Sequence, residues 1–257
     1  MARVIINSDD YGMNPSINDA IISAFNSNLI SSTTCLVNYP EGLIDGHAKL
    51  AENKIKLSSV GIHLNLTTGK PLTESISKNS RFCENGFFHS RVRDKPLLFL
   101  DKKSRKDVRV EIEAQIQRFI EVMGCKPSHI DGHHHIHTEF AIFRIILGQA
   151  KKYDINCMRK TRNLGIDRIG IVKKIYKGLL NFLIERNFRS TDFFGSLTDL
   201  DGQIFDSNRT YEIMVHCVYK DGISNIVLDD DGIPLKDKIE NFLPAKITLF
   251  RFLEIHQ

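Results

Sequence analysis

Apolar and polar residues follow two alternating patterns along the 257-residue chain. Short runs rich in β-branched residues predict strands, and segments in which apolar residues recur every three or four positions predict helices. The expected strands cover residues 3–7, 33–37, 59–66, 128–131, 156–160 and 212–218. The expected helices begin at Asn14-Pro15 and then cover residues 43–52, 106–123, 140–153, 166–185 and 236–242. Repeated strand–helix units predict an α/β fold with a parallel sheet, open or closed into a barrel.

An irregular stretch interrupts this alternation at residues 68–105. Long irregular segments inside compact domains are often functional, so we expect an insertion or a lid here. Four of its aromatic residues either form a wall for a ligand or complete the core: Phe82, Phe87, Phe88 and His89. The chain has no internal repeat and no low-complexity linker, which favours one domain over residues 1–257.

Polar clusters follow the predicted strands at the points where these end. In parallel α/β folds the chemistry takes place at the carboxyl ends of the strands. The clusters are Asp9 with Asp10, His63 with Asn65, His133, and His216. Their placement is the first indication of a functional site, and it depends on the pattern of residues alone.

The segment from His129 to His137 contains five of the ten histidines of the chain in nine residues. Neutral imidazole offers a lone pair at physiological pH, which makes histidine the commonest transition-metal ligand. One ion cannot use all five, so the others would orient the ligands or contact substrate. The alternative is a histidine-rich surface turn.

Asp9 and Asp10 follow a predicted buried strand directly. Two adjacent carboxylates are costly there unless a cation or a shared proton relieves their repulsion. One can bind a metal while its neighbour acts as a base, although a solvated turn is the simpler interpretation of this pair alone. A single histidine in an apolar strand, such as His63, is usually a core residue, but two further strand ends also offer ligands.

Four segments resemble motifs of the YdjC-like carbohydrate deacetylases, which include the chitooligosaccharide deacetylases. Asn7-Ser-Asp9-Asp10-Tyr-Gly12 resembles their N-A-D-D-F-G opening, and residues 31–38 resemble their second strand. Residues 61–72 resemble their third strand and the turn after it, and residues 126–137 resemble their P-T-H-x-D-S-H-H-H-V-H block. Order and spacing agree across residues 3–160.

The resemblance implies a TIM-barrel-like (β/α) fold, as a complete or an incomplete barrel, and a metal site usually described with magnesium. By motif position the metal ligands are Asp10, His63 and His133, and the general base is Asp9. Two imidazoles and one carboxylate suit zinc, cobalt or nickel chemically better than magnesium, so the sequence leaves the identity of the ion open.

His216 matches the family's general acid, although Cys217 follows it where the family has proline. Arg159 matches an arginine after the next strand of the family, and we assign it to substrate binding. Asn65, His135 and His137 are further candidates for contacts to sugar hydroxyls, because they flank the proposed ligands.

Composition narrows the range of partners. A formal charge of +4 without a basic cluster containing aromatic residues argues against nucleic acid. Five dispersed cysteines without a CxxC motif indicate reduced thiols. The chain begins without a signal-peptide pattern and has no apolar stretch of membrane-spanning length, so we expect a cytoplasmic protein. The resemblance also suggests a homodimer.

The combined prediction is a metal-dependent hydrolase that removes acetyl groups from small oligosaccharides containing N-acetylglucosamine. One rival is another metal hydrolase, such as a phosphoesterase or amidohydrolase. Those folds commonly carry a His-x-His pair on the first strand, whereas this strand ends in Asp9 and Asp10. The other rival is a sugar-binding relative without catalytic activity.

Overall fold

The computed structural model describes residues 2–94, 96–165, 169–202, 205–220, 223–244 and 247–255. Within these ranges a parallel sheet of seven strands runs in the order β6-β3-β2-β1-β8-β7, and β11 pairs with the start of β1. The strands are β1 (Ala2–Tyr11), β2 (Ser32–Cys35), β3 (Val60–Leu64), β6 (Ile130–Gly132), β7 (Phe193–Ser196), β8 (Thr210–Val215) and β11 (Ile247–Leu249). The central strand, β1, is almost entirely buried, as expected for a parallel sheet covered on both faces.

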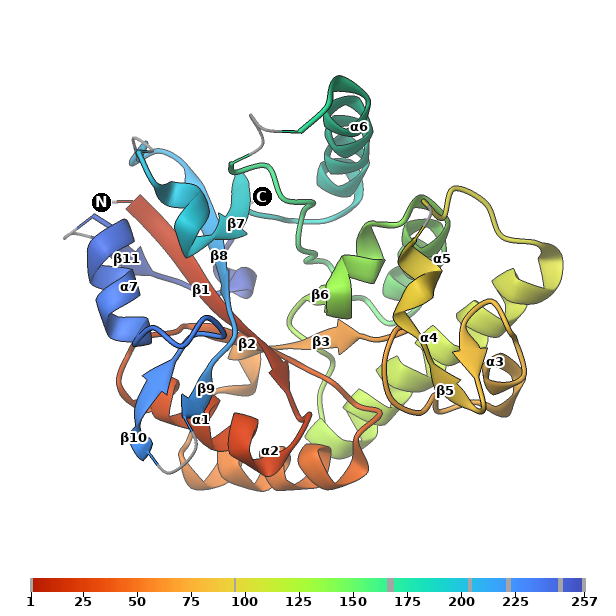
Figure 1. Cartoon of the computed structure of the whole chain (residues 1–257), viewed down its shortest axis with the longest axis horizontal. Coiled ribbons are helices and arrows are strands. Elements are labelled where there is room, and N and C mark those ends of the chain that lie inside the picture. The colour runs from red at the N-terminus through yellow and green to blue at the C-terminus, as the bar shows by residue number, and fades with distance from the viewer. Residues whose placement is uncertain are drawn as a thin grey trace.

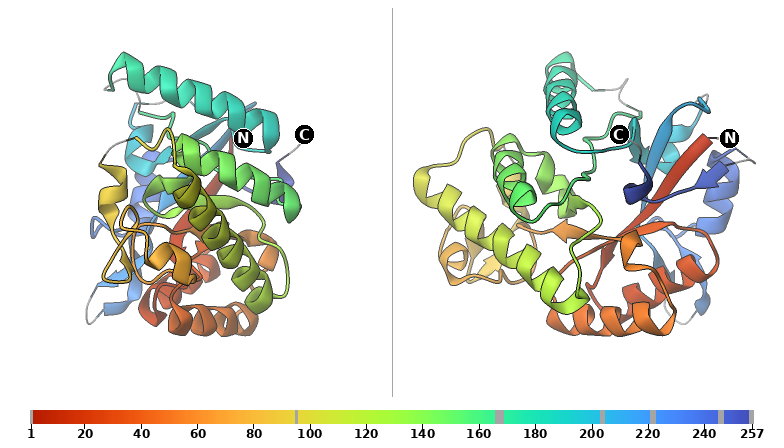
Figure 2. Two further views of the ribbon diagram at one scale, coloured as in Figure 1. Left: turned by 90° about the vertical axis from the view of Figure 1, so that its right-hand side faces the viewer. Right: turned by 180° about the vertical axis from the view of Figure 1, so that it is seen from behind.

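Helices cover the outside of the sheet (Figures 1 and 2). They are α1 (Pro15–Asn26), α2 (Pro40–Glu52), α4 (Lys102–Met123), α5 (Phe140–Lys152), α6 (Ile171–Asn187) and α7 (Leu235–Phe242). The helices α1 and α2 pack on each other, as do α4 and α5. Local chemistry sets their ends: Asn14 caps α1 by accepting from the Ile17 amide, and Gly124 ends α4 in the left-handed conformation.

The sheet curls into an incomplete barrel. The segment that follows α5 lies between the edge strands β6 and β7. Its Met158 forms an isolated bridge with Ile130 of β6, and its Cys157 forms another with Arg189, which precedes β7. The amide of Asn163 then donates to the Phe194 carbonyl on β7 over 3.0 Å. The predicted α/β barrel-like fold is therefore confirmed, but the strand expected at 156–160 is reduced to these bridges.

Other predicted boundaries shift. The strand expected at 212–218 is wrong as one unit, because β8 ends at Val215 and a separate hairpin follows, formed by β9 (Val218–Lys220) and β10 (Ile223–Leu228). His216 lies in the break between them. The helix expected from residue 166 begins at Ile171, and residues 166–168 of that prediction lie outside the described residues.

Before α4 begins at Lys102, the described part of the irregular stretch at 68–105 contains only short elements: α3 (Glu74–Ser77), β4 (Cys83–Glu84), β5 (Phe87–Phe88) and a 3-10 turn at Ser90–Arg93. Buried polar groups organise it, because the Glu111 carboxylate on α4 accepts from the backbone amides of Leu72 and Thr73. Phe82 and Phe88 are buried in the core, whereas Phe87 is about half exposed. Two of the four aromatic residues, Phe82 and Phe88, therefore complete the core.

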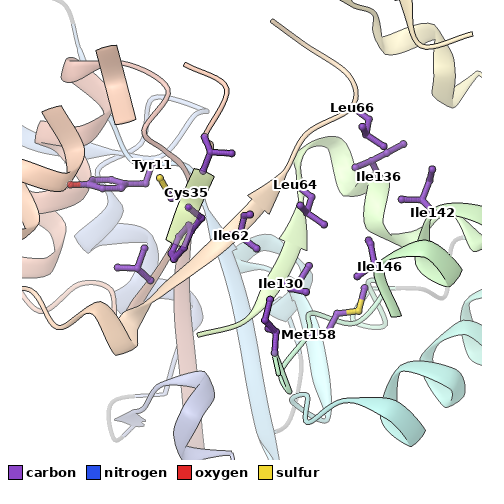
Figure 3. Close-up of a cluster of buried hydrophobic side chains, with 14 of the residues drawn as sticks. Tyr11, Cys35, Ile62, Leu64, Leu66, Ile130, Ile136, Ile142, Ile146 and Met158 are labelled. Carbon is purple, nitrogen blue, oxygen red and sulfur yellow. The ribbon is translucent and has the colours of Figure 1, made fainter. Parts of the chain in front are cut away.

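The core continues from the sheet into the helices that follow it. Figure 3 shows Ile62 and Leu64 of β3 beside Ile130 of β6, with Ile142 and Ile146 of α5 on the outer side. All five cysteines are free thiols, as predicted. None of the described helices is long and apolar enough to cross a membrane.

Candidate metal centre

Three side chains from three strand ends converge at the carboxyl edge of the sheet. Asp10 lies at the end of β1, His63 on β3, and His133 directly after β6. The Asp10 Oδ1 atom lies 2.8 Å from His133 Nδ1 and 3.3 Å from His63 Nε2. One ligand atom from each residue lies within 4.8 Å of the other two. The structure thus brings the three predicted ligands together.

This donor set fits a divalent ion. Asp10 Oδ1 is buried and makes no hydrogen bond with any described residue, although two imidazole nitrogens lie close to it. A buried carboxylate oxygen without a hydrogen bond is costly unless another group compensates it. A cation between one carboxylate oxygen and two imidazole nitrogens would do so, and such sets are typical of catalytic metal sites with open positions.

The backbone at this edge is strained at the residues that form the centre. Asp10 has a φ of 70°, and His134 and His135, next to His133, have φ values of 50° and 55°. Side chains other than glycine rarely adopt this region, and such outliers concentrate at functional sites.

The strain at Asp10 explains how two consecutive carboxylates reach one interior. In a regular strand, successive side chains point to opposite faces of the sheet. The pairing of β1 with β2 shifts register between Ser8 and Tyr11, so the alternation is broken at Asp9 and Asp10. Asp9 and Asp10 both have an oxygen within 4.8 Å of a ring nitrogen of His63.

His63 is oriented by a carboxylate behind it. Its Nδ1 atom lies 2.7 Å from Asp131 Oδ1, and Thr34 Oγ1 donates to Asp131 Oδ2 over 3.0 Å. This contact leaves Nε2 facing Asp10, as in the carboxylate–histidine pairs that support metal ligands. Burial alone would lower the pKa of His63, but Asp131 and Asp9 outweigh it and raise this pKa to about 10.

Asp9 lies next to the candidate metal centre, with an oxygen within 4.8 Å of a His63 ring nitrogen, and it is almost completely buried. Arg159 donates to both of its carboxylate oxygens, over 2.8 and 2.7 Å, and Asn7 Nδ2 donates to Oδ1 over 2.9 Å. Burial would raise the pKa of Asp9, but Arg159 and His63 hold it well below its usual range. Asp9 is therefore ionised and fixed in orientation at neutral pH.

The structure revises the role assigned to Arg159. The side chain was predicted to contact substrate, but it is completely buried. Its guanidinium bonds three carboxylates, those of Asp9, Asp131 and Glu212. A group enclosed in this way cannot reach a sugar, so Arg159 ties the carboxylates together instead.

Asn65 is revised for a similar reason. It is completely buried, and its Nδ2 donates to Asn38 Oδ1 and to the Thr68 carbonyl, while its Oδ1 accepts from the amide of Thr67. These bonds hold the turn after β3 and leave the side chain no contact with a ligand. Polar residues at strand ends organise turns as often as they bind ligands.

The remaining histidines of the rich segment differ in accessibility. His137 is completely buried, and this burial is the main reason that its pKa lies well below the usual range. It therefore cannot touch substrate directly, contrary to the prediction. His135 is half-buried with its ring 5.9 Å from that of Phe194, and it stays a candidate. His134, which the sequence did not single out, is exposed and lies 3.1 Å from Thr67 Oγ1 through its Nδ1 atom.

His216 follows β8, beside β1 in the sheet, and its side chain is 30% exposed. Its Nδ1 lies 3.3 Å from Asp230 Oδ2, and its backbone amide donates to Asp229 Oδ1 over 2.8 Å. The ring is thus accessible and partly oriented.

Three residues of the site were not singled out by their sequence pattern: Thr34, Asp131 and Glu212. Asp131 could have been found, because it stands two residues before the ligand His133 in the histidine-rich segment. Thr34 and Glu212 sit inside predicted strands and carried no signal.

A curled parallel sheet with an Asp-His-His cluster at its carboxyl edge defines an α/β barrel-like protein with a candidate metal centre. The family model described as YdjC-like protein matches residues 3–238, and the chain belongs to this family. A chitooligosaccharide deacetylase of Proteus mirabilis is 30% identical over 85% of this chain and 82% of its own. A carbohydrate deacetylase of Halalkalibacterium halodurans is 36% identical over 63% of this chain and 65% of its own.

A solved structure from Enterococcus faecalis, named for cellobiose-phosphate cleavage, shares the fold. It superposes with a TM-score of 0.73 at 23% identity and covers 100% of this chain and 99% of its own. At that identity the likeness confirms the architecture alone.

Proposed function

We propose that this chain is a metal-dependent deacetylase that removes acetyl groups from small oligosaccharides containing N-acetylglucosamine. The observation that carries the proposal is the convergence of Asp10, His63 and His133 around a buried carboxylate oxygen without a hydrogen bond. Relatives at 30–36% identity are named chitooligosaccharide and carbohydrate deacetylases, which supports both the reaction and the substrate class.

Each group near the centre has a role in this reaction. A divalent ion held by the three ligands would polarise the acetamide carbonyl and acidify a water molecule. Asp9 accepts a proton from the attacking water, and Arg159 keeps the carboxylate ionised and aligned for that transfer. His216, in its protonated form, donates to the sugar nitrogen as the C–N bond breaks, because an amine leaves poorly without a proton. Acetate and the free amino sugar are the products.

The ion and the assembly are part of the proposal. The family resemblance suggests magnesium, whereas two imidazoles with one carboxylate favour zinc, cobalt or nickel. Metal-free protein reloaded with each ion separately would distinguish them. The homodimer and the cytoplasmic location stay predictions, and light scattering in solution would test the first.

The test compares two reactions under matched conditions. Acetate release from N,N′-diacetylchitobiose and phosphate release from a generic phosphoester are measured with and without chelator, and with several divalent ions added back. We expect metal-dependent acetate release, lost in Asp10→Asn and retained in the control Asp237→Asn, which alters an exposed carboxylate on α7. Undiminished activity after chelation would refute metal dependence. Activity on phosphoesters alone would replace the proposal with the rival hydrolase.

A further inference from the structure

We propose that Glu212 is a positioning residue that acts through Arg159 to hold Asp9 and Asp131 in their working orientations. This inference rests on the proposed function, because it assigns Asp9 and the Asp131–His63 pair to the reaction. Glu212 itself is completely buried, and within the described ranges its side chain pairs with Arg159 rather than with a candidate ligand.

The sheet register places Glu212 beside its target. It lies on β8 opposite Ile5 of β1 and Phe194 of β7. The Arg159 Nε atom donates to Glu212 Oε1 over 2.5 Å. The Phe194 ring lies against the guanidinium with its centroid 4.8 Å from the central carbon.

These contacts fix the guanidinium plane. A guanidinium presents its donors in a rigid planar fork, so fixing one edge and one face sets the direction of the others. Glu212 occupies the Nε edge and Phe194 the face, while the terminal nitrogens bond Asp9 and Asp131. Rotation of the plane would therefore disturb both carboxylates at once.

Burial of the Glu212 carboxylate at this position costs folding free energy. Its Oε2 atom is buried and makes no hydrogen bond within the described part of the chain. Burial, together with the charges of Asp131 and Asp9, raises the pKa of Glu212 to about 7 against the opposing effect of Arg159. Apolar residues often replace buried ion pairs without loss of stability, so orientation of Arg159 is the role that accounts for this carboxylate.

Its influence reaches two parts of the centre. Through Asp9 it sets the carboxylate that accepts the proton from water. Through Asp131 it supports the carboxylate that orients His63, whose Nδ1 lies 2.7 Å from Asp131 Oδ1. Substituting Glu212 should therefore slow the chemical step and leave substrate binding nearly unchanged.

The principal test is Glu212→Gln, which keeps the shape of the side chain and removes its charge. We expect kcat to fall about 10–100-fold with KM within about twofold, as is typical for groups that orient active-site residues. The matched control is Glu240→Gln on α7, an exposed glutamate whose substitution should change neither constant. In an Arg159→Lys background, Glu212→Gln should cause no further loss, because its effect passes through Arg159. Independent, multiplicative losses would mean a merely structural role and would overturn the proposal.

A second measurement does not depend on activity. The Arg159 Nε–H resonance, identified by its absence in Arg159→Lys, should exchange slowly with solvent in the wild-type protein. It should shift and exchange faster in Glu212→Gln. An unchanged resonance together with an unchanged kcat would refute the inference. If the wild-type protein releases no acetate from any substrate tested, the proposed function fails, while this resonance still reports whether Glu212 fixes Arg159.

Discussion

Replacing Arg159 with methionine would remove the guanidinium that bonds three buried carboxylates while keeping an unbranched side chain. Asp9, Asp131 and Glu212 would be left in the interior without their cation. Removal of one partner from a buried ion pair costs about 3–5 kcal/mol, because the remaining charge is uncompensated. Three carboxylates share this arginine, so we expect a loss of unfolding free energy at or above the upper end of that range.

The loss should depend on pH with a defined sign. In the wild-type protein the pKa of Asp9 is held well below its usual range, so its pairing stabilises the fold above the ordinary aspartate value and is lost as pH falls. In the variant, burial without Arg159 raises the pKa of the carboxylates, and folding then takes up protons. The difference in stability between the two proteins should therefore be larger at pH 8 than at pH 5.

Urea unfolding at both pH values measures this difference. For a chain of this size, about 3–5 kcal/mol corresponds to a fall in Tm of roughly 6–20 °C. Arg209→Met is the control, because Arg209 pairs with Asp192 at the surface and such pairs contribute about 0–1 kcal/mol. An Arg159→Met protein within about 1 kcal/mol of wild type at pH 8, with no change at pH 5, would show that the carboxylates do not depend on this arginine.

Two further predictions test packing and the proton donor. Gly61→Ala should destabilise the fold by about 1–3 kcal/mol in urea unfolding, because the new Cβ would lie 2.5 Å from the buried His129 ring. Gly148→Ala on the open face of α5 should stabilise it by about 0.5–1 kcal/mol in the same assay. His216→Ala should lower kcat about 10²–10⁴-fold and Asp230→Asn less, and a His216→Ala enzyme with normal kcat would exclude this histidine as the acid.

The convergence of the three predicted ligands could be inferred from the sequence because it depends on few assumptions. Strand–helix alternation predicts a parallel sheet, and the carboxyl ends of parallel strands face the same edge. Asp10, His63 and His133 each follow or end such a strand, so their meeting required no knowledge of packing. The family resemblance selected these three residues, by motif position, from the polar residues at the strand ends, and membership of the YdjC-like family is confirmed.

The groups behind the ligands could not be inferred in this way. Whether a strand residue such as Thr34 or Glu212 faces the barrel interior, and which residue it meets, depends on sheet register. Register follows from tertiary packing, as in the pairing of Ile5 with Glu212. The same limit explains the misassignment of Arg159, because its motif position does not reveal that the side chain is completely buried. The strand expected at 156–160 failed because sequence propensity does not reveal whether a segment finds partners along its whole length.

The free-energy cost of burying these carboxylates bears on metal binding. Asp9, Asp131 and Glu212 place three carboxylates around one guanidinium. Asp10 adds a fourth carboxylate beside His63 and His133, and its Oδ1 makes no hydrogen bond with the described residues. Asp10 is also held at a φ of 70°, a conformation that costs about 1–3 kcal/mol in a residue other than glycine. Backbone strain and excess negative charge among the ligands favour cation binding. A set of ligands that was already neutral and relaxed without the ion would gain little free energy by binding it. The ion should therefore stabilise the fold as well as enable the reaction, and loss of Asp10 should abolish the activity while relieving part of the strain.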